Sequence, residues 1–208
     1  MLITNGDKPP RIGVLAVQGD FAAHAQALED AGAEAVEVRK ASELAGLDGL
    51  ILPGGESTTL LKFLERDGLL ESLQCFVAEK PAFGTCAGCI LLARNVSRPP
   101  QQSLGAMDIS VERNAYGRQI DSAIQTGETK LPGGPLEMVY IRAPRILSVG
   151  PGVEVMAERD GFPVLVREGR LLAATFHPEL SSDRRVHRLF VEMVREQLER
   201  NKEFTGTK

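Results

Sequence analysis

The stretch PAFGTCAGCILLA, from Pro81 to Ala93, indicates the fold class because an apolar strand runs directly into an apolar helix within it. Cys86 stands at the turn, between Gly84 and Gly88. This G-x-C-x-G pattern is the thiol counterpart of the nucleophile elbow, in which small neighbours let a reactive side chain stand clear. The following helix N-terminus would favour a thiolate and present N–H groups to a developing oxyanion. The stretch therefore predicts a nucleophilic cysteine, with a small buried residue as the alternative.

Short apolar segments alternate with helical segments on the amino-terminal side of this turn. Strands are predicted at 11–17, 33–38 and 47–53, and helices at 20–32, 57–68 and 69–79. Asp20 is expected to cap the first helix and Gly32 to end it. The side chains expected on the apolar face of that helix are Phe21, Ala25, Leu28 and Ala31. Because strand and helix alternate at short spacing, this half predicts βαβ units around a parallel sheet.

The remainder of the chain has a different pattern. From about Gln101 to Ala174, strand-like runs are broken by glycine and proline, which predicts antiparallel additions to the sheet or extensions of it. An amphipathic helix is predicted at about 183–200. Its apolar stripe consists of Val186, Leu189, Phe190, Met193 and Leu198. The chain shows no internal repeat and no linker long enough to separate two domains.

Length and composition limit the classes of function. The 208 residues, 43% of them hydrophobic, are enough for one α/β domain with a sizeable core. With 24 Lys and Arg against 28 Asp and Glu and no basic block, nucleic acid is not expected as a partner. The apolar runs are too short to cross a membrane. Three cysteines, a low and odd number, fit the reducing cytoplasm better than a disulfide scaffold.

A candidate base follows a second apolar strand, in the stretch ATFHPEL. Pro178 keeps His177 extended, and side chains two residues apart in extended chain point to the same side. Glu179 is then placed to hold the tautomer of His177 and to stabilise its imidazolium, as the acid of a catalytic triad does. A solvated turn with an exposed histidine is the alternative. The presence of an elbow cysteine in the same chain favours the triad.

A third motif, LILPGGEST, spans Leu50 to Thr58 and has two adjacent glycines after a strand. Gly54 and Gly55 allow a backbone turn whose N–H groups face a ligand. An ordinary strand-to-helix turn is the alternative. In combination with Cys86 and His177, the turn is expected to form the second half of an oxyanion hole.

These three motifs, in this order, resemble the class I (triad) glutamine amidotransferases, and most specifically the glutaminase subunits of pyridoxal 5′-phosphate synthase. The matching phrases are IGVLAVQGD, LILPGGEST, FGTCAG, VERNAYGRQIDS, IRAP and FHPEL, and they extend from Arg11 to the final helix. The resemblance implies an α/β, flavodoxin-like fold with a central mixed, mostly parallel sheet flanked by helices. It also implies a single glutamine amidotransferase domain over 1–208, with its core at about 11–200.

The function that the resemblance implies is hydrolysis of L-glutamine to L-glutamate and ammonia, without a cofactor or a metal. The ammonia would pass to a synthase subunit, PdxS, in a hetero-oligomer with many copies of each subunit, for vitamin B6 biosynthesis. Carried onto this chain, Cys86 is the nucleophile, His177 the base and Glu179 the acid that orients the base. The N–H groups of Gly55 and Ala87 are the implied oxyanion hole. The implied glutamine-binding residues are Gly54, Gly55, Glu56, Arg113, Ile141 and Arg142. Without the resemblance, the two arginines would be interpreted as surface residues.

Cys89 departs from the family pattern, which predicts an apolar residue such as leucine at this position. CAGC is a C-x-x-C at a helix N-terminus, so a thiol oxidoreductase is one alternative function. Within a glutaminase, the same spacing allows a reversible Cys86–Cys89 bond that would shut off the enzyme and shield Cys86 from further oxidation. The other interpretation of Cys89 is a core residue beneath the elbow. A DJ-1/PfpI-like stress protein would share the elbow cysteine but is not expected to carry HPE together with GGEST. A zinc site would have an incomplete ligand set.

Overall fold

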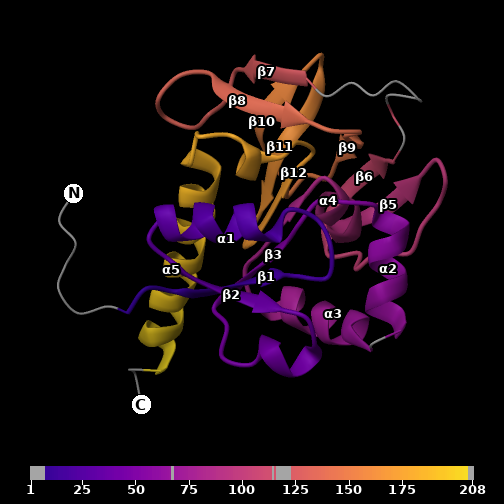
Figure 1. The fold of residues 1–208 in the computed structure, drawn as a ribbon. Coiled ribbons are helices and arrows are strands. Elements are labelled where there is room, and N and C mark those ends of the chain that lie inside the picture. Colours follow the sequence, from indigo (N-terminus) through magenta and orange to yellow (C-terminus); the bar gives the residue numbers. More distant parts are fainter. Residues whose placement is uncertain (1–7, 67, 114, 116–122, 206–208) are drawn as a thin grey trace.

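The computed structural model of the protein describes residues 8–66, 68–113, 115 and 123–205. A seven-stranded sheet lies at its centre, in the order β10-β11-β12-β4-β3-β1-β2 (Figure 1). Its strands are β1 (Arg11–Leu15), β2 (Glu34–Val38), β3 (Gly49–Leu52), β4 (Ala82–Thr85), β10 (Glu154–Arg159), β11 (Phe162–Glu168) and β12 (Leu171–Ala174). The five strands from β12 to β2 are parallel, whereas β10 and β11 are antiparallel. The predicted mixed, mostly parallel sheet is confirmed.

Helices cover both faces of this sheet (Figure 1). They are α1 (Phe21–Asp30), α2 (Ser57–Arg66), α3 (Leu69–Glu79), α4 (Ala87–Leu92) and α5 (Arg185–Thr205), with short 3₁₀ turns η1 (Ala41–Leu44) and η2 (Pro178–Leu180). One apolar cluster joins the sheet to α2, α3 and α4, and a second joins the opposite face to α1 and α5. In the part of the chain that is described, no helix combines the length and the apolar character needed to cross a membrane.

Two smaller sheets lie beside the central one. The first contains β5 (Ala93–Ser97), β6 (Met107–Glu112) and β9 (Arg145–Val149), and the second contains β7 (Ala123–Gly127) and β8 (Leu136–Tyr140). The expected additions to the central sheet are therefore correct for β10 and β11 but wrong for β6 and β8, which form sheets of their own. Positions 114 and 116–122 of the motif VERNAYGRQIDS lie outside the described residues.

Alternation along the strands decides which side chains meet which helices. In β4, Ala82 joins the apolar cluster of α2, α3 and α4, whereas Phe83 joins that of α1 and α5. Thr85 lies two residues after Phe83, so its side chain points to the same face of the sheet, and it is wholly buried. The strand thus presents a hydroxyl to the α1 and α5 side, one residue before Cys86.

The carboxyl ends of β1, β3, β4 and β12 lie at one edge of the sheet, because these strands are parallel neighbours. In open α/β sheets this edge is where ligands bind. The chain leaving these four strands leads to Asp20, Gly54, Cys86 and His177, respectively. The fold therefore brings the three sequence motifs together at this edge.

Candidate active site

Cys86 occupies a strained turn between β4 and α4. Its φ of 48° and ψ of −101° lie in a region that L-residues rarely adopt, and its side chain is buried. The Cys86 N–H donates to the carbonyl of Ala174 in β12 at 2.9 Å, and the Cys86 carbonyl accepts from the N–H of Ile90 at 3.2 Å. These bonds hold the cysteine between a strand and a helix, which is the arrangement of a nucleophile elbow.

The glycines on either side of Cys86 are required by close backbone packing. A side chain at Gly88 would overlap the carbonyl oxygen of Leu52 in β3, and one at Gly84 would overlap the carbonyl of Gly88. The elbow therefore packs against its neighbouring strand backbone to backbone. The G-x-C-x-G pattern therefore reflects this lack of space.

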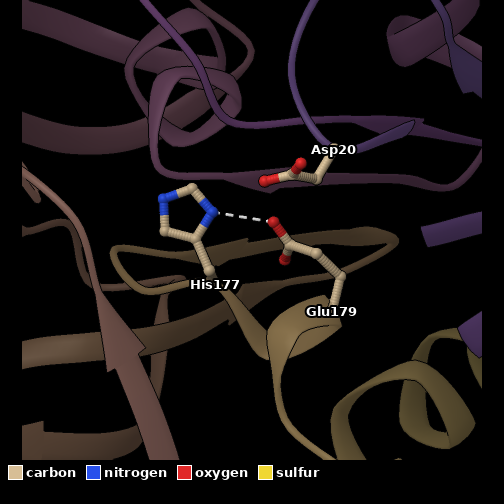
Figure 2. Close-up of side chains that lie close together, drawn as sticks. All are labelled: Asp20, His177 and Glu179. Carbon is tan, nitrogen blue, oxygen red and sulfur yellow. Dashed lines mark hydrogen bonds and ion pairs between the residues drawn. The ribbon is translucent and has the colours of Figure 1, made fainter. Parts of the chain in front are cut away.

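His177 and Glu179 form a buried pair beside the elbow (Figure 2). His177 Nδ1 lies 2.7 Å from Glu179 Oε1, and the backbone N–H of His177 donates to the carbonyl of Val139 in β8 at 2.8 Å. The structure places the two side chains together as expected, but for a different reason. His177 has φ −107° and ψ 84°, and the 3₁₀ turn η2 begins at Pro178, so a turn rather than extended chain brings Glu179 back.

Charge near the His177 ring keeps it protonated. Burial lowers its pKa, whereas interactions with the Cys86 thiol and the Glu179 carboxylate raise it, and the net result is a pKa of about 10. Nε2 of the ring makes no hydrogen bond of ordinary geometry to a described residue, so its interaction with the sulfur is one of proximity and charge. At neutral pH the pair is therefore an imidazolium held by a carboxylate, next to the sulfur of Cys86.

Asp20 lies closer to this pair than the sequence indicates. It occupies the N-cap position of α1 as expected, but its side chain makes no capping hydrogen bond. Instead its carboxylate points toward His177 and Glu179 (Figure 2), and ligand atoms of all three lie within 4.8 Å of one another. These three side chains have the donor types that a metal ion takes, but Nδ1 of His177 is already bonded to Glu179. A metal would have to break that bond.

Of the two glycines after β3, Gly54 packs against His177 and Cys86, whereas Gly55 packs against Gln18. A side chain at Gly54 would overlap the His177 ring and would approach Cβ of Cys86 to 3.3 Å. Gly55 has a φ of 126°, which strongly favours glycine. The side chain of Gln18, from the end of β1, donates to the carbonyl of Glu56 at 2.8 Å and so anchors the turn.

Glu56 and Arg113, both predicted to bind substrate, interact with the start of α2. The Glu56 carboxylate accepts from the N–H groups of Thr58 and Thr59 at 3.0 and 2.7 Å, and is thus an N-terminal cap. Partial burial raises the Glu56 pKa, but these bonds and the Thr59 hydroxyl outweigh it and lower the pKa to about 2. Arg113 Nη2 donates to the Thr58 hydroxyl at 2.6 Å and lies 3.6 Å from Glu56.

The environment of Arg113 differs from that of a surface arginine. Its side chain is 10% exposed, and its Nε is buried without a hydrogen-bond partner among the described residues. A buried guanidinium nitrogen without a partner is available to a ligand carboxylate.

The turn at Ile141 and Arg142 borders the side chain of Cys86. The Ile141 carbonyl lies 3.9 Å from Sγ of Cys86, and the Ile141 side chain is 38% exposed. Arg142 has a φ of 47° and is exposed. Of the two arginines predicted to bind glutamine, Arg113 is thus enclosed near α2 whereas Arg142 lies in a strained, open turn.

Cys89 is a core residue. Its side chain is wholly buried in the apolar cluster of α2, α3 and α4, and burial, together with the nearby Cys86, raises the pKa of its thiol. Both cysteines are free. A thiol that is buried and protonated is a poor partner for disulfide exchange, so the oxidoreductase alternative is not favoured.

Sequence reasoning missed a group of buried histidines behind the pair. His24 in α1 and His187 in α5 are both wholly buried, and His24 lies beside Glu179. The burial of His24 could have been predicted only from its spacing. It stands three residues after Phe21 and four before Leu28, which places it on the face that α1 turns to the sheet.

Comparisons with known proteins identify the family of this chain. A model described as the SNO glutamine amidotransferase family matches residues 14–196. The pyridoxal 5′-phosphate synthase subunit PdxT of Koribacter versatilis is 64% identical over 185 residues, which are 89% of this chain and 96% of that protein. The PdxT subunit of Solibacter usitatus is 53% identical over 87% of this chain and 97% of its own length.

Two solved structures are similar as well. A crystal structure of a glutamine amidotransferase has a TM-score of 0.82 and 48% identity over 88% of this chain and 98% of that one. A GMP synthase-type protein from Thermoplasma acidophilum has a TM-score of 0.71 over 95% of this chain and all of its own, but 18% identity, so it is evidence for the fold alone.

Proposed function

This chain belongs to the SNO glutamine amidotransferase family, and from that premise we propose that it hydrolyses L-glutamine to L-glutamate and ammonia with Cys86 as nucleophile. The observation that carries the assignment of residues is the meeting of three strand ends. The elbow cysteine after β4 lies beside the bonded pair His177 and Glu179 after β12, and Gly54 after β3 packs against both. Metal ligation or disulfide exchange would not require this combination of residues.

The proposed reaction has two halves. The Cys86 thiolate attacks the side-chain amide carbon of glutamine, and the tetrahedral oxyanion is stabilised by the N–H groups of Gly55 and Ala87. His177 then gives its proton to the departing ammonia, leaving a glutamyl thioester. A water molecule, deprotonated by His177, attacks the thioester and releases glutamate and the thiolate. Glu179 holds the ring orientation in both halves.

Substrate binding is proposed at the α2 edge of the site. A zwitterionic amino acid needs a cation for its carboxylate and an anion for its ammonium group. Arg113, with its buried Nε, supplies the first, and Glu56, ionised because of its low pKa, supplies the second. Backbone groups of Gly54, Gly55 and Ile141 complete the proposed pocket, with Arg142 at its rim.

The relatives at 64% and 53% identity are named as subunits of pyridoxal 5′-phosphate synthase. We extend this role to the present chain, so its ammonia passes to the synthase subunit PdxS for the biosynthesis of vitamin B6. The cytoplasm is the proposed location, and three free cysteines support a reducing compartment.

The test of the residue roles is glutamate release from L-glutamine by the chain in complex with PdxS. Cys86→Ala should be inactive while remaining folded, and Cys75→Ala, which removes an exposed cysteine in α3, is the matched control and should keep full activity. His177→Asn should lower kcat by on the order of 10²–10⁴-fold. Glu179→Gln should be milder, because it misorients the base without removing it. Substantial activity in Cys86→Ala would refute the nucleophile assignment.

A further inference from the structure

A line of buried polar side chains continues from the triad into the protein. Beyond His177 and Glu179, the second carboxylate oxygen of Glu179, Oε2, lies 3.2 Å from His24 Nε2. The other ring nitrogen of His24, Nδ1, lies 3.0 Å from His187 Nε2. His24 Nε2 also lies 3.1 Å from the hydroxyl of Thr85. All the side chains behind His177 are wholly buried, so water does not reach these contacts.

Both added histidines are neutral. Burial lowers the pKa of His24 well below its usual value, and the neighbouring His187 and His177 lower it further. Burial also lowers the pKa of His187 to about 3, with Arg184 adding to the decrease and Asp30 opposing it. The rings of both pack edge-on against Phe83, at centroid distances of 6.4 and 6.0 Å, which is an apolar setting. Each ring therefore carries one proton.

The contacts determine where these protons lie. A carboxylate oxygen only accepts hydrogen bonds, so His24 must carry its proton on Nε2, facing Glu179 and Thr85. Nδ1 of His24 is then an acceptor and takes the Nε2 proton of His187. His187 Nδ1 is left as a bare nitrogen, which agrees with its burial without a hydrogen-bond partner among the described residues. In this arrangement each N–H of the His24 and His187 rings faces an acceptor.

We propose that His24 is a positioning residue for the glutaminase reaction, holding the acid of the triad against the strand that carries the nucleophile. Its Nε2–H contacts both Glu179 and Thr85, and Thr85 is the residue directly before Cys86. This inference rests on the proposed triad and adds a fourth side chain that acts through Glu179 without touching substrate.

The chemistry requires a donor at this place. Glu179 Oε1 is engaged by His177, while Oε2 is buried and has no hydrogen bond of ordinary geometry to a described residue, so the His24 N–H is the donor that faces it. A buried carboxylate oxygen without a donor is costly, and the group would rotate or bind a proton. A neutral imidazole supplies the donor without a second positive charge. A cation there would repel the His177 imidazolium and weaken its hold on the proton.

The experiment compares His24→Leu, His24→Gln and His187→Leu in the full chain with PdxS, measuring kcat, KM for glutamine and the thermal midpoint Tm. His24→Leu should lower kcat by about tenfold or more with KM within about twofold, because the N–H that faces the charged Glu179 carboxylate is lost. His24→Gln should recover most of kcat, since its amide N–H takes the place of Nε2–H. His187→Leu is the matched control: an equally buried histidine of the same network without contact to Glu179, it should lower Tm but keep kcat near wild type.

The outcomes separate this inference from the proposed function. Wild-type kcat in His24→Leu, an equal loss in His187→Leu, or failure of His24→Gln to restore kcat would each overturn it. If His24→Leu does not fold, the test is to compare kcat of His24→Gln with kcat of His24→Asn. The shorter amide of asparagine should not reach Glu179, so His24→Asn should have the lower kcat. Equal kcat in these two amide variants would count against the positioning role. Activity remaining in Cys86→Ala would instead refute the triad itself.

Discussion

Cys86 has an unfavourable backbone conformation that the residues around it enforce. Its positive φ is fixed by a hydrogen bond to β12 on one side and the first turn of α4 on the other. The six residues of α4 make a short helix, so its dipole is a modest source of stabilisation for a thiolate. The imidazolium of His177 is the stronger positive group in this site, and its persistence depends on Cys86 and on Glu179.

This dependence gives a prediction about pH. The His177 pKa of about 10 lies above its usual value, so the ring keeps the proton that ammonia release needs until pH rises through about 10. In wild type the alkaline limb of kcat/KM against pH should fall near pH 10. In Glu179→Gln one of the groups that raise this pKa is gone, so the limb should move to lower pH.

The measurement is kcat/KM for glutamine between pH 6 and 11, with Cys75→Ala as the control whose limb stays in place. An alkaline limb that does not move in Glu179→Gln would contradict the role of the carboxylate in holding the proton.

Packing between α4 and β3 explains why a residue larger than glycine is not expected at position 88, beside the elbow. Gly88 in α4 meets the backbone of β3, because a side chain there would overlap the Leu52 carbonyl. A rigid carbonyl cannot move aside as a flexible side chain can, so an added methyl must push α4 away from the sheet.

We therefore predict that Gly88→Ala lowers both stability and activity. Overpacking of this kind costs about 1–3 kcal/mol, and each kcal/mol lowers Tm by roughly 2–4 °C in a chain of this size. Gly152→Ala is the control, since its added carbon would make only an ordinary contact with Glu168, at 3.6 Å. Differential scanning calorimetry on both variants is the measurement, and equal Tm values would contradict the packing argument.

Most elements could be predicted from sequence, whereas their assignment to sheets could not. The helix at 69–79 is found at its predicted bounds, because its spacing and the preceding Gly68 define it locally. Strand β5, by contrast, is not among the predicted strands, because the stretch PAFGTCAGCILLA indicates only a strand followed by a helix. It is a strand because Ala93–Ser97 pairs with β6, a contact that no local pattern contains. The final helix also extends to Thr205, beyond the predicted end at about 200.

The candidate site shows the same contrast between short-range patterns, which can be predicted from the sequence, and long-range contacts, which cannot. Cys86, His177 and Glu179 stand in contiguous motifs, so short-range patterns were enough to select them. His24 was placed on no functional face, because its burial depends on His187, 163 positions away, and on Thr85. Asp20 was expected to cap α1, but the approach of His177 and Glu179 gives its carboxylate other neighbours.

The last prediction concerns the assembled enzyme. An unpartnered glutaminase would waste glutamine, so we expect weak ammonia release by the isolated chain and a large increase on adding PdxS. Gly54 and Gly55 are the proposed switch, because a peptide between glycines turns over at little steric cost and so aims or withdraws an N–H donor. The measurement is ammonia release at saturating glutamine with increasing PdxS, with Cys86→Ala as the blank. Full activity without PdxS would contradict the switch.

The burial of the histidines has a consequence for spectroscopy. The chain has three histidines, and all of them lie in the one line of contacts that runs from His187 through His24 and Glu179 to His177. Every imidazole resonance in a nitrogen-15 NMR spectrum would therefore come from the active site or its support, with no surface ring to obscure it. The two neutral rings should each show one protonated nitrogen across the physiological range, while the third shows two. The protein thus carries its own reporters of protonation, which need only nitrogen-15 enrichment and no added probe group.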